Sequence, residues 1–235
     1  GLSTGGSGTI TFDPTLATAQ VGNISWQLPI YDSLLHRDAK TGAFTPGLAT
    51  RATVVDPTTI TMTLRSGVVF SDGTPFDAQA VEFSLLRNKT APQHGQFNPA
   101  LQQITQIDVT DPLDLTVHFA TPVAGVFFGL LFLPSTYIVS PTAAQKPGAN
   151  LGTAPVGAGP YKLESYVPDE SITLVKNPTY WDAKAIHLES IEFVNVAPGP
   201  QEVNSLKAGT VDVQPLSSFT SVQALQHQFT VDQVA

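Results

Sequence analysis

Strand pairs joined by Asp-Pro turns constrain the fold of this 235-residue chain more than any other feature. Between Thr59 and Leu64, threonines alternate with Ile, Met and Leu, and this period of two is typical of a strand with one buried face. Asp56-Pro57 precedes this strand and predicts a hairpin turn after a partner strand at 52–55. A second hairpin is predicted for Ile104–Val109 and Leu115–Phe119, around Asp111-Pro112. No internal repeat is evident from the side chains.

Helices are predicted between these hairpins. Asp77 is a plausible N-cap for a helix over 77–87, whose apolar residues recur at helical spacing. Further helices are expected at Trp26–Leu35, Val123–Phe132, Gln201–Ala208 and Gln223–Phe229, and a strand at Tyr137–Val139. A third hairpin is expected at Tyr161–Tyr166 and Ser171–Lys176, followed by a strand at Leu188–Val196. This order of elements indicates a mixed fold, α/β or α+β.

Composition excludes several classes of function. The net charge is −8, and no run of Lys or Arg exists, which argues against a nucleic-acid partner. The chain has no cysteine, so disulfides and thiolate metal sites are impossible. No apolar run approaches the roughly 20 residues of a membrane span.

Residues that could carry chemistry are scattered. The five histidines are far apart in sequence, so no metal site and no cofactor are expected. Asp72, Asp77 and Glu82 could form a carboxylate pair for hydrolysis, but Asp72 is better explained as a turn residue, Asp77 as a helix cap and Glu82 as a helix surface position. Tyr180 and Trp181 could stack on a ligand, but a packing role is favoured.

Several blocks, in this order and covering nearly the whole chain, resemble the bacterial extracytoplasmic solute-binding proteins of the oligopeptide, dipeptide and nickel type (family 5). They are Thr45–Ala49, Leu64–Ala78, Pro155–Leu163, Leu174–Asp182 and Leu206–Asp212. In the last block the family often has an acidic residue where this chain has Thr210. Family members are considerably longer, so the chain is expected to be an N-terminal portion.

The resemblance implies a lobe of a periplasmic-binding-protein-like class II fold with an inserted β-rich subdomain. Residues 1–31 and 153–235 are expected to form the core of lobe I, and residues 32–152 the inserted subdomain. Lobe II is expected to lie outside this chain. Proteins of this kind close around the ligand by a hinge motion.

The resemblance also implies a function, namely the substrate-binding component of an ATP-binding-cassette importer. It is expected to capture peptides or peptide-like solutes outside the cytoplasmic membrane, to act as a monomer with a membrane permease as partner, and to be lipid-anchored before processing. By position, three loops are expected to face the ligand: Thr18, Ala19 and Gln20; Gln96 and Phe97; Gln214, Pro215 and Leu216.

Alternatives stay open at this point. A protein of the same family could bind an oligosaccharide or another small solute. The rivals from other classes are a hydrolase that uses acidic residues near Asp72 and an interaction module without a transport role.

Overall fold

The computed structural model describes residues 2–3, 11–16, 21–91, 99–216 and 218–230. The chain divides into two compact units. The larger unit comprises residues 10–162 and 176–187, and the smaller unit comprises residues 1–9, 163–175 and 188–235. The domain boundaries at residues 31, 32, 152 and 153 remain a prediction.

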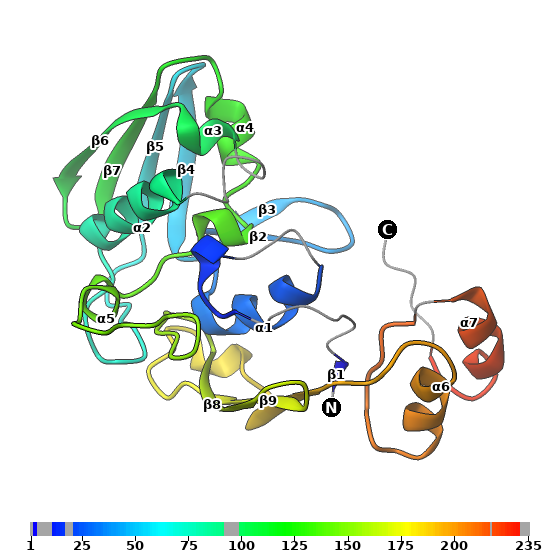
Figure 1. Cartoon of the computed structure of the whole chain (residues 1–235). Coiled ribbons are helices and arrows are strands. Elements are labelled where there is room, and N and C mark those ends of the chain that lie inside the picture. The colour runs from blue at the N-terminus through cyan, green and yellow to red at the C-terminus, as the bar shows by residue number, and fades with distance from the viewer. Residues whose placement is uncertain (1, 4–10, 17–20, 92–98, 217, 231–235) are drawn as a thin grey trace. The chain divides into compact units, whose positions relative to one another are not determined.

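The larger unit contains most of the helices and two sheets (Figure 1). Its first half holds η1 (Pro14–Leu16), α1 (Val21–Tyr31), β2 (Leu35–Arg37), β3 (Phe44–Pro46), β4 (Ala49–Asp56), β5 (Thr59–Leu64) and α2 (Ala78–Thr90). Its second half holds α3 (Pro99–Gln102), β6 (Ile104–Asp111), β7 (Asp114–Phe119), α4 (Ala124–Phe128), η3 (Pro134–Thr136), α5 (Pro141–Ala144) and η4 (Ala183–Ala185). No helix among the described residues is both long enough and apolar enough to cross a membrane.

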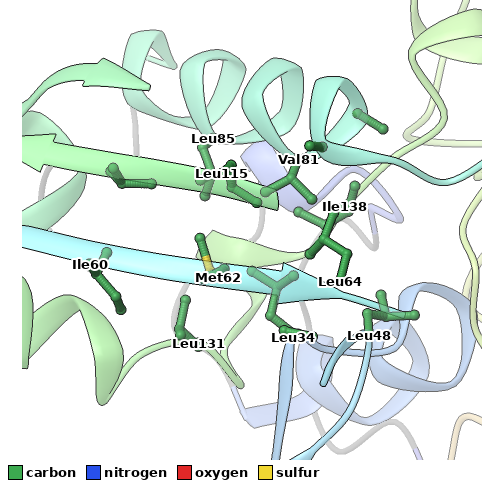
Figure 2. Packing of buried hydrophobic residues seen from close by; sticks show 14 of the residues in the cluster. Leu34, Leu48, Ile60, Met62, Leu64, Val81, Leu85, Leu115, Leu131 and Ile138 are labelled. Carbon is green, nitrogen blue, oxygen red and sulfur yellow. The ribbon is translucent and has the colours of Figure 1, made fainter. Parts of the chain in front are cut away.

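The four-stranded sheet of the larger unit has the order β4-β5-β7-β6, and all its neighbours are antiparallel. The predicted alternation is confirmed, because every second residue of β5 and β7 is buried. Figure 2 shows Val81 and Leu85 of α2 beside Leu115 of β7, with Met62 and Leu64 of β5 in the same cluster. The core of this unit therefore lies between one face of the sheet and the helices that cover it.

The two hairpins of this sheet are structural copies of each other. β4 and β6 start 104 − 49 = 55 residues apart, and β5 and β7 start 114 − 59 = 55 residues apart. Register shifts fall at equivalent places, between Ala49 and Arg51 in β4 and between Ile104 and Gln106 in β6. Such bulges on edge strands disturb the ladder that another chain would otherwise extend.

Hydrogen bonds at the two turns follow the same repeat. Leu64 N donates to Leu113 O at 2.7 Å, and its counterpart Phe119 N donates to Thr58 O at 2.9 Å. The first amides of the following helices bond to equivalent turn residues, since Ala78 N donates to Pro112 O and Ala124 N donates to Pro57 O. The turn of the second hairpin thus satisfies the first amide of α2, and the turn of the first hairpin satisfies the first amide of α4.

Helix α1 ends earlier than the sequence pattern predicted. The expected helix over 26–35 stops at Tyr31, because Asp32 takes a left-handed conformation with φ of 59°. The residues after it form β2 instead. Two further predictions were wrong in extent or type: α4 covers only Ala124–Phe128, and residues 137–139 are buried but belong to no strand.

The backbone at Gly157 and Gly159 packs directly on the end of α1. Gly159 N donates to Ile30 O at 2.9 Å. A Cβ atom on Gly157 would lie 2.3 Å from Ile30 O, and one on Gly159 would lie 2.3 Å from Pro29 O. These glycines are therefore required by close backbone approach.

The smaller unit holds most of the third sheet, with the order β1-β10-β9-β8. Its strands are β1 (Leu2–Ser3), β8 (Tyr161–Val167), β9 (Ser171–Lys176) and β10 (Ser190–Val194). Its helices are α6 (Pro200–Lys207) and α7 (Phe219–Leu225). The predicted hairpin at 161–176 is confirmed, and the last helix starts four residues before its predicted position at Gln223.

Candidate ligand-binding loops and their supports

The first predicted loop follows a segment that an ion pair fixes in place. Arg87 in α2 donates from Nη1 to Asp13 Oδ1 at 2.8 Å and from Nη2 to Asp13 Oδ2 at 2.5 Å. Asp13 is only 6% exposed, and Thr15 N and its hydroxyl also donate to Oδ1. Burial alone would raise the pKa of Asp13, but the hydrogen bonds from Arg87 and Thr15 outweigh it and lower that pKa.

Residues just before Asp13 are tied to helix α1. Gln27 Nε2 donates to Thr11 O at 3.0 Å, and the buried Tyr31 hydroxyl donates to Phe12 O at 2.9 Å. Backbone that would otherwise lack partners is thereby satisfied by side chains of one helix. The predicted ligand residues Thr18, Ala19 and Gln20 themselves lie outside the described residues.

The second predicted loop leaves from the end of α2. Lys89 Nζ donates to Ile104 O at 2.5 Å, and Gln102 Nε2 donates to Lys89 O at 2.8 Å, so the end of α2 is joined to α3 and β6. Gln96 and Phe97 also lie outside the described residues.

The third predicted loop, Gln214–Leu216, belongs to the smaller unit and is described. Gln214 Nε2 donates to Pro215 O at 2.9 Å. Gln214 Oε1 is buried and has no hydrogen-bond partner within the described parts of the chain. An unsatisfied buried amide oxygen costs free energy.

Asp72 is saturated with donors in a turn. Thr74 N and the Thr74 hydroxyl donate to Oδ1 at 3.0 and 2.6 Å, and the Ser140 hydroxyl donates to Oδ2 at 2.9 Å. Burial acts to raise the pKa of Asp72, but these hydrogen bonds lower it. A carboxylate in this state is a poor general acid, and the predicted turn role is confirmed.

Asp77 also has the role that the pattern predicted. Its Oδ1 accepts a hydrogen bond from Ala80 N at 2.9 Å and caps α2. Glu82 lies on the same helix at a half-buried position. Asp72 and Asp77 are therefore committed to the turn and to the helix cap.

A buried network around Asp32 was not predicted. Asp32 is 3% exposed and accepts hydrogen bonds at Oδ2 from the Tyr180 hydroxyl at 3.0 Å and from Trp181 Nε1 at 3.1 Å. The Arg65 guanidinium lies over the Trp181 ring, 3.6 Å from its centroid. The packing role favoured for Tyr180 and Trp181 is confirmed, because both are committed to this network.

Within the described ranges, no three His, Asp or Glu side chains gather at one place where they could hold a metal ion. His36 and His118 each lie beside one aspartate, at 2.6 and 3.0 Å respectively. One carboxylate and one imidazole make an incomplete coordination set for a protein metal site.

The structure is similar to solved bacterial binding proteins over almost all of its length. The peptide complex of the periplasmic binding protein DppA from Helicobacter pylori gives a TM-score of 0.82 at 24% identity, covering 96% of this chain and 48% of that one. A nickel ABC transporter structure from Bacillus halodurans gives 0.76 at 26% identity, covering 96% and 44%. The fold is therefore that of a periplasmic binding protein.

Residues 43–233 match the family described as bacterial extracellular solute-binding proteins, family 5 Middle, and the chain belongs to this family. Among characterised relatives, the glutathione-binding protein GsiB of Salmonella paratyphi A is 33% identical over 154 residues. That alignment covers 66% of this chain and 30% of GsiB. The chain therefore spans well under half of the length of this relative.

Proposed function

We propose that these residues are part of the substrate-binding component of an ATP-binding-cassette importer, which captures peptides or peptide-like solutes. The match to family 5 over residues 43–233 carries this proposal. The similar protein GsiB binds glutathione, which is itself a small peptide. We propose two lobes that close on the ligand, with these 235 residues forming part of one of them.

The ligand-facing positions are the three loops at Thr18–Gln20, Gln96–Phe97 and Gln214–Leu216. The free Oε1 atom of Gln214 supports the third loop, because a peptide N–H could satisfy it. Its Nε2 atom already donates to Pro215 O, which fixes the direction of the amide. A main-chain amide of the ligand is the donor that we assign to this position.

Substitution of Gln214 tests this assignment. Gln214→Met keeps the length of the side chain but removes the acceptor, and it should weaken peptide binding by a loss of about 1 kcal/mol, or roughly fivefold. Gln106→Met is the matched control, since Gln106 is exposed, donates to Asp108 on the same strand and belongs to no predicted loop. Isothermal titration calorimetry measures the peptide affinity of both variants, in a version of the protein that carries both lobes. Equal binding by Gln214→Met and the parent would remove Gln214 from the site.

The place of action and the partners follow from the same proposal. The protein would work outside the cytoplasmic membrane, as a monomer, and deliver its ligand to a membrane permease. Anchoring by a lipid before processing is part of the proposal. No enzymatic role is proposed, because Asp72 and Asp77 are committed to a turn and a helix cap.

A further inference from the structure

One histidine of the larger unit contacts a buried carboxylate from a half-exposed position. His36 Nε2 in β2 lies 2.6 Å from Asp32 Oδ1, beyond the end of α1. The side chain of Asp32 is 3% exposed, whereas that of His36 is 38% exposed. Protons can therefore reach the imidazole from solvent while its partner stays buried.

Among the described residues, other titratable groups also face this pair, and one is the buried Tyr137, whose pKa is raised first by burial and then by Asp32. Arg65, which follows β5, acts on His36 electrostatically and donates from Nε to Gly47 O at 3.0 Å. The imidazole packs against Gly47, where a Cβ atom would lie 3.0 Å from its Cδ2. The Tyr180 hydroxyl reaches the other oxygen of Asp32 and is held neutral, since burial first and Asp32 second raise the pKa of Tyr180.

Asp32 joins three separate pieces of the larger unit. Ser33 N and His36 bond its Oδ1 atom, and Tyr180 and Trp181 bond its Oδ2 atom. Tyr180 and Trp181 belong to residues 176–187, the segment by which the chain passes through the larger unit between two parts of the smaller one. The carboxylate therefore links the end of α1, the β2–β3 hairpin and this passing segment.

We propose that His36 and Asp32 form a pH-sensitive latch, in which protonation of the imidazole strengthens the link between β2, the end of α1 and the segment with Tyr180 and Trp181. A positive imidazolium beside a buried carboxylate makes a charge-assisted hydrogen bond, and a neutral imidazole makes a weaker one. The latch does not depend on ligand binding.

The sign of the pH dependence follows from the surroundings of His36. The hydrogen bond with Asp32 raises the pKa of His36 above its ordinary value of 6.5, against the opposing effects of burial and Arg65. The added stability is fully present below pH 6.5 and is lost as the pH rises through the higher pKa of the folded protein.

Urea unfolding of the chain and of two variants between about pH 5.5 and pH 9 tests the latch. His36→Gln should increase the unfolding equilibrium constant by about tenfold at the acidic end, and by less as the pH rises. His118→Gln is the matched control, because His118 pairs with Asp108, whose side chain is 42% exposed. Its effect should be small, because an exposed ion pair contributes little to stability.

An effect of His36→Gln that is the same at every pH, or an equal pH-dependent effect of His118→Gln, would overturn the proposal. An NMR titration of the His36 ring in the unaltered chain gives a test that needs no variant. A titration midpoint above 6.5 supports the latch, and a midpoint at or below 6.5 contradicts it.

Discussion

Two buried carboxylates, Asp13 and Asp32, organise the polar contacts of the larger unit. Each accepts several hydrogen bonds from residues distant in sequence, such as Arg87 for Asp13 and Tyr180 for Asp32. A buried charge is stable only when it is paired or fully hydrogen-bonded, and both aspartates meet this requirement. Removing a single donor should therefore cost more than the average surface substitution.

Substitution of Arg87 tests whether the buried Asp13 needs its partner. Arg87→Met leaves Asp13 buried without its cation, and we expect it to lower the free energy of unfolding by about 2–3 kcal/mol, because Arg87 is partly exposed. Arg87→Lys should restore only part of this loss, since an ammonium group cannot donate in the bidentate geometry. Urea unfolding measures both. A loss below about 0.5 kcal/mol for Arg87→Met would show that the pair contributes no more than a surface ion pair.

Because of the Asp13–Arg87 pair, we expect the protein to lose stability in acid. Because folding lowers the pKa of Asp13, its contribution is present above the ordinary value of 3.8 and is lost as the pH falls through the lower pKa of the folded protein. Urea unfolding below pH 4 should show that the parent chain loses stability faster than Arg87→Met. Parallel pH profiles for the two proteins would contradict this.

Substitution of Asp72 distinguishes its role in the turn from a catalytic role. Asp72→Asn keeps one acceptor oxygen, so we expect a loss of about 1 kcal/mol in unfolding free energy and no other defect. Asp77→Asn is the control, because asparagine caps helices as well as aspartate does, and it should change the unfolding free energy little. A hydrolytic activity present in the parent and lost in Asp72→Asn would contradict the turn role.

Residue roles were predictable where the partners are local. Asp72 and Asp77 bond backbone amides within three residues, so their sequence neighbourhood suffices. Asp32 was missed because its donors Tyr180 and Trp181 lie 148 and 149 residues away, and no local pattern connects them. Gln214 was placed in a loop by the family resemblance, but its free oxygen required the structure.

At the scale of elements, alternation and turn residues predicted the hairpins well. β5 and β7 were located to within one residue of their observed ends. The relation between the two hairpins was missed, although Asp56-Pro57 and Asp111-Pro112 stand at equivalent positions of the two turns. Most other equivalent positions, such as Thr59 and Asp114, carry different side chains, and the repeat is clearest in the backbone hydrogen bonds and bulges.

Helix lengths were predicted less well because tertiary contacts decide where helices end. The positive φ of Asp32 ends α1 although apolar residues continue to Leu35. Asp32 can adopt this conformation since its carboxylate is satisfied by Ser33 N, His36 and the two aromatic donors. The cause lies in residues that a window around α1 does not contain.

The contact between Gly157 and α1 is an element-scale feature with a clear test. Gly157→Ala places a Cβ atom 2.3 Å from Ile30 O and 2.8 Å from Tyr31 Cα, so we expect a loss of about 3 kcal/mol or more, or failure to fold. Gly125→Ala is the matched control, since a Cβ there meets nothing within 4 Å and alanine favours α4. Thermal unfolding compares the two. Equal stability of both variants would contradict the close approach.

At the scale of the whole molecule, the order of the sequence blocks identified the family, and residues 43–233 match it. The blocks mainly encode structure: Ser71–Pro75 is a turn, and Gly157–Pro160 packs on α1. Blocks of this kind define the fold, whereas ligand loops vary. The sequence therefore predicted the class of protein better than it predicted the solute.

Calorimetric titration of small peptides, glutathione included, is the most direct test of the proposed capture between two lobes. It should compare the 235-residue chain with a longer version that carries a second lobe. The account predicts that the longer protein binds a peptide at least about 100-fold more tightly, because only two lobes can enclose the ligand and exclude water. Equally tight binding by both proteins, or no binding of any peptide by the longer one, would contradict it.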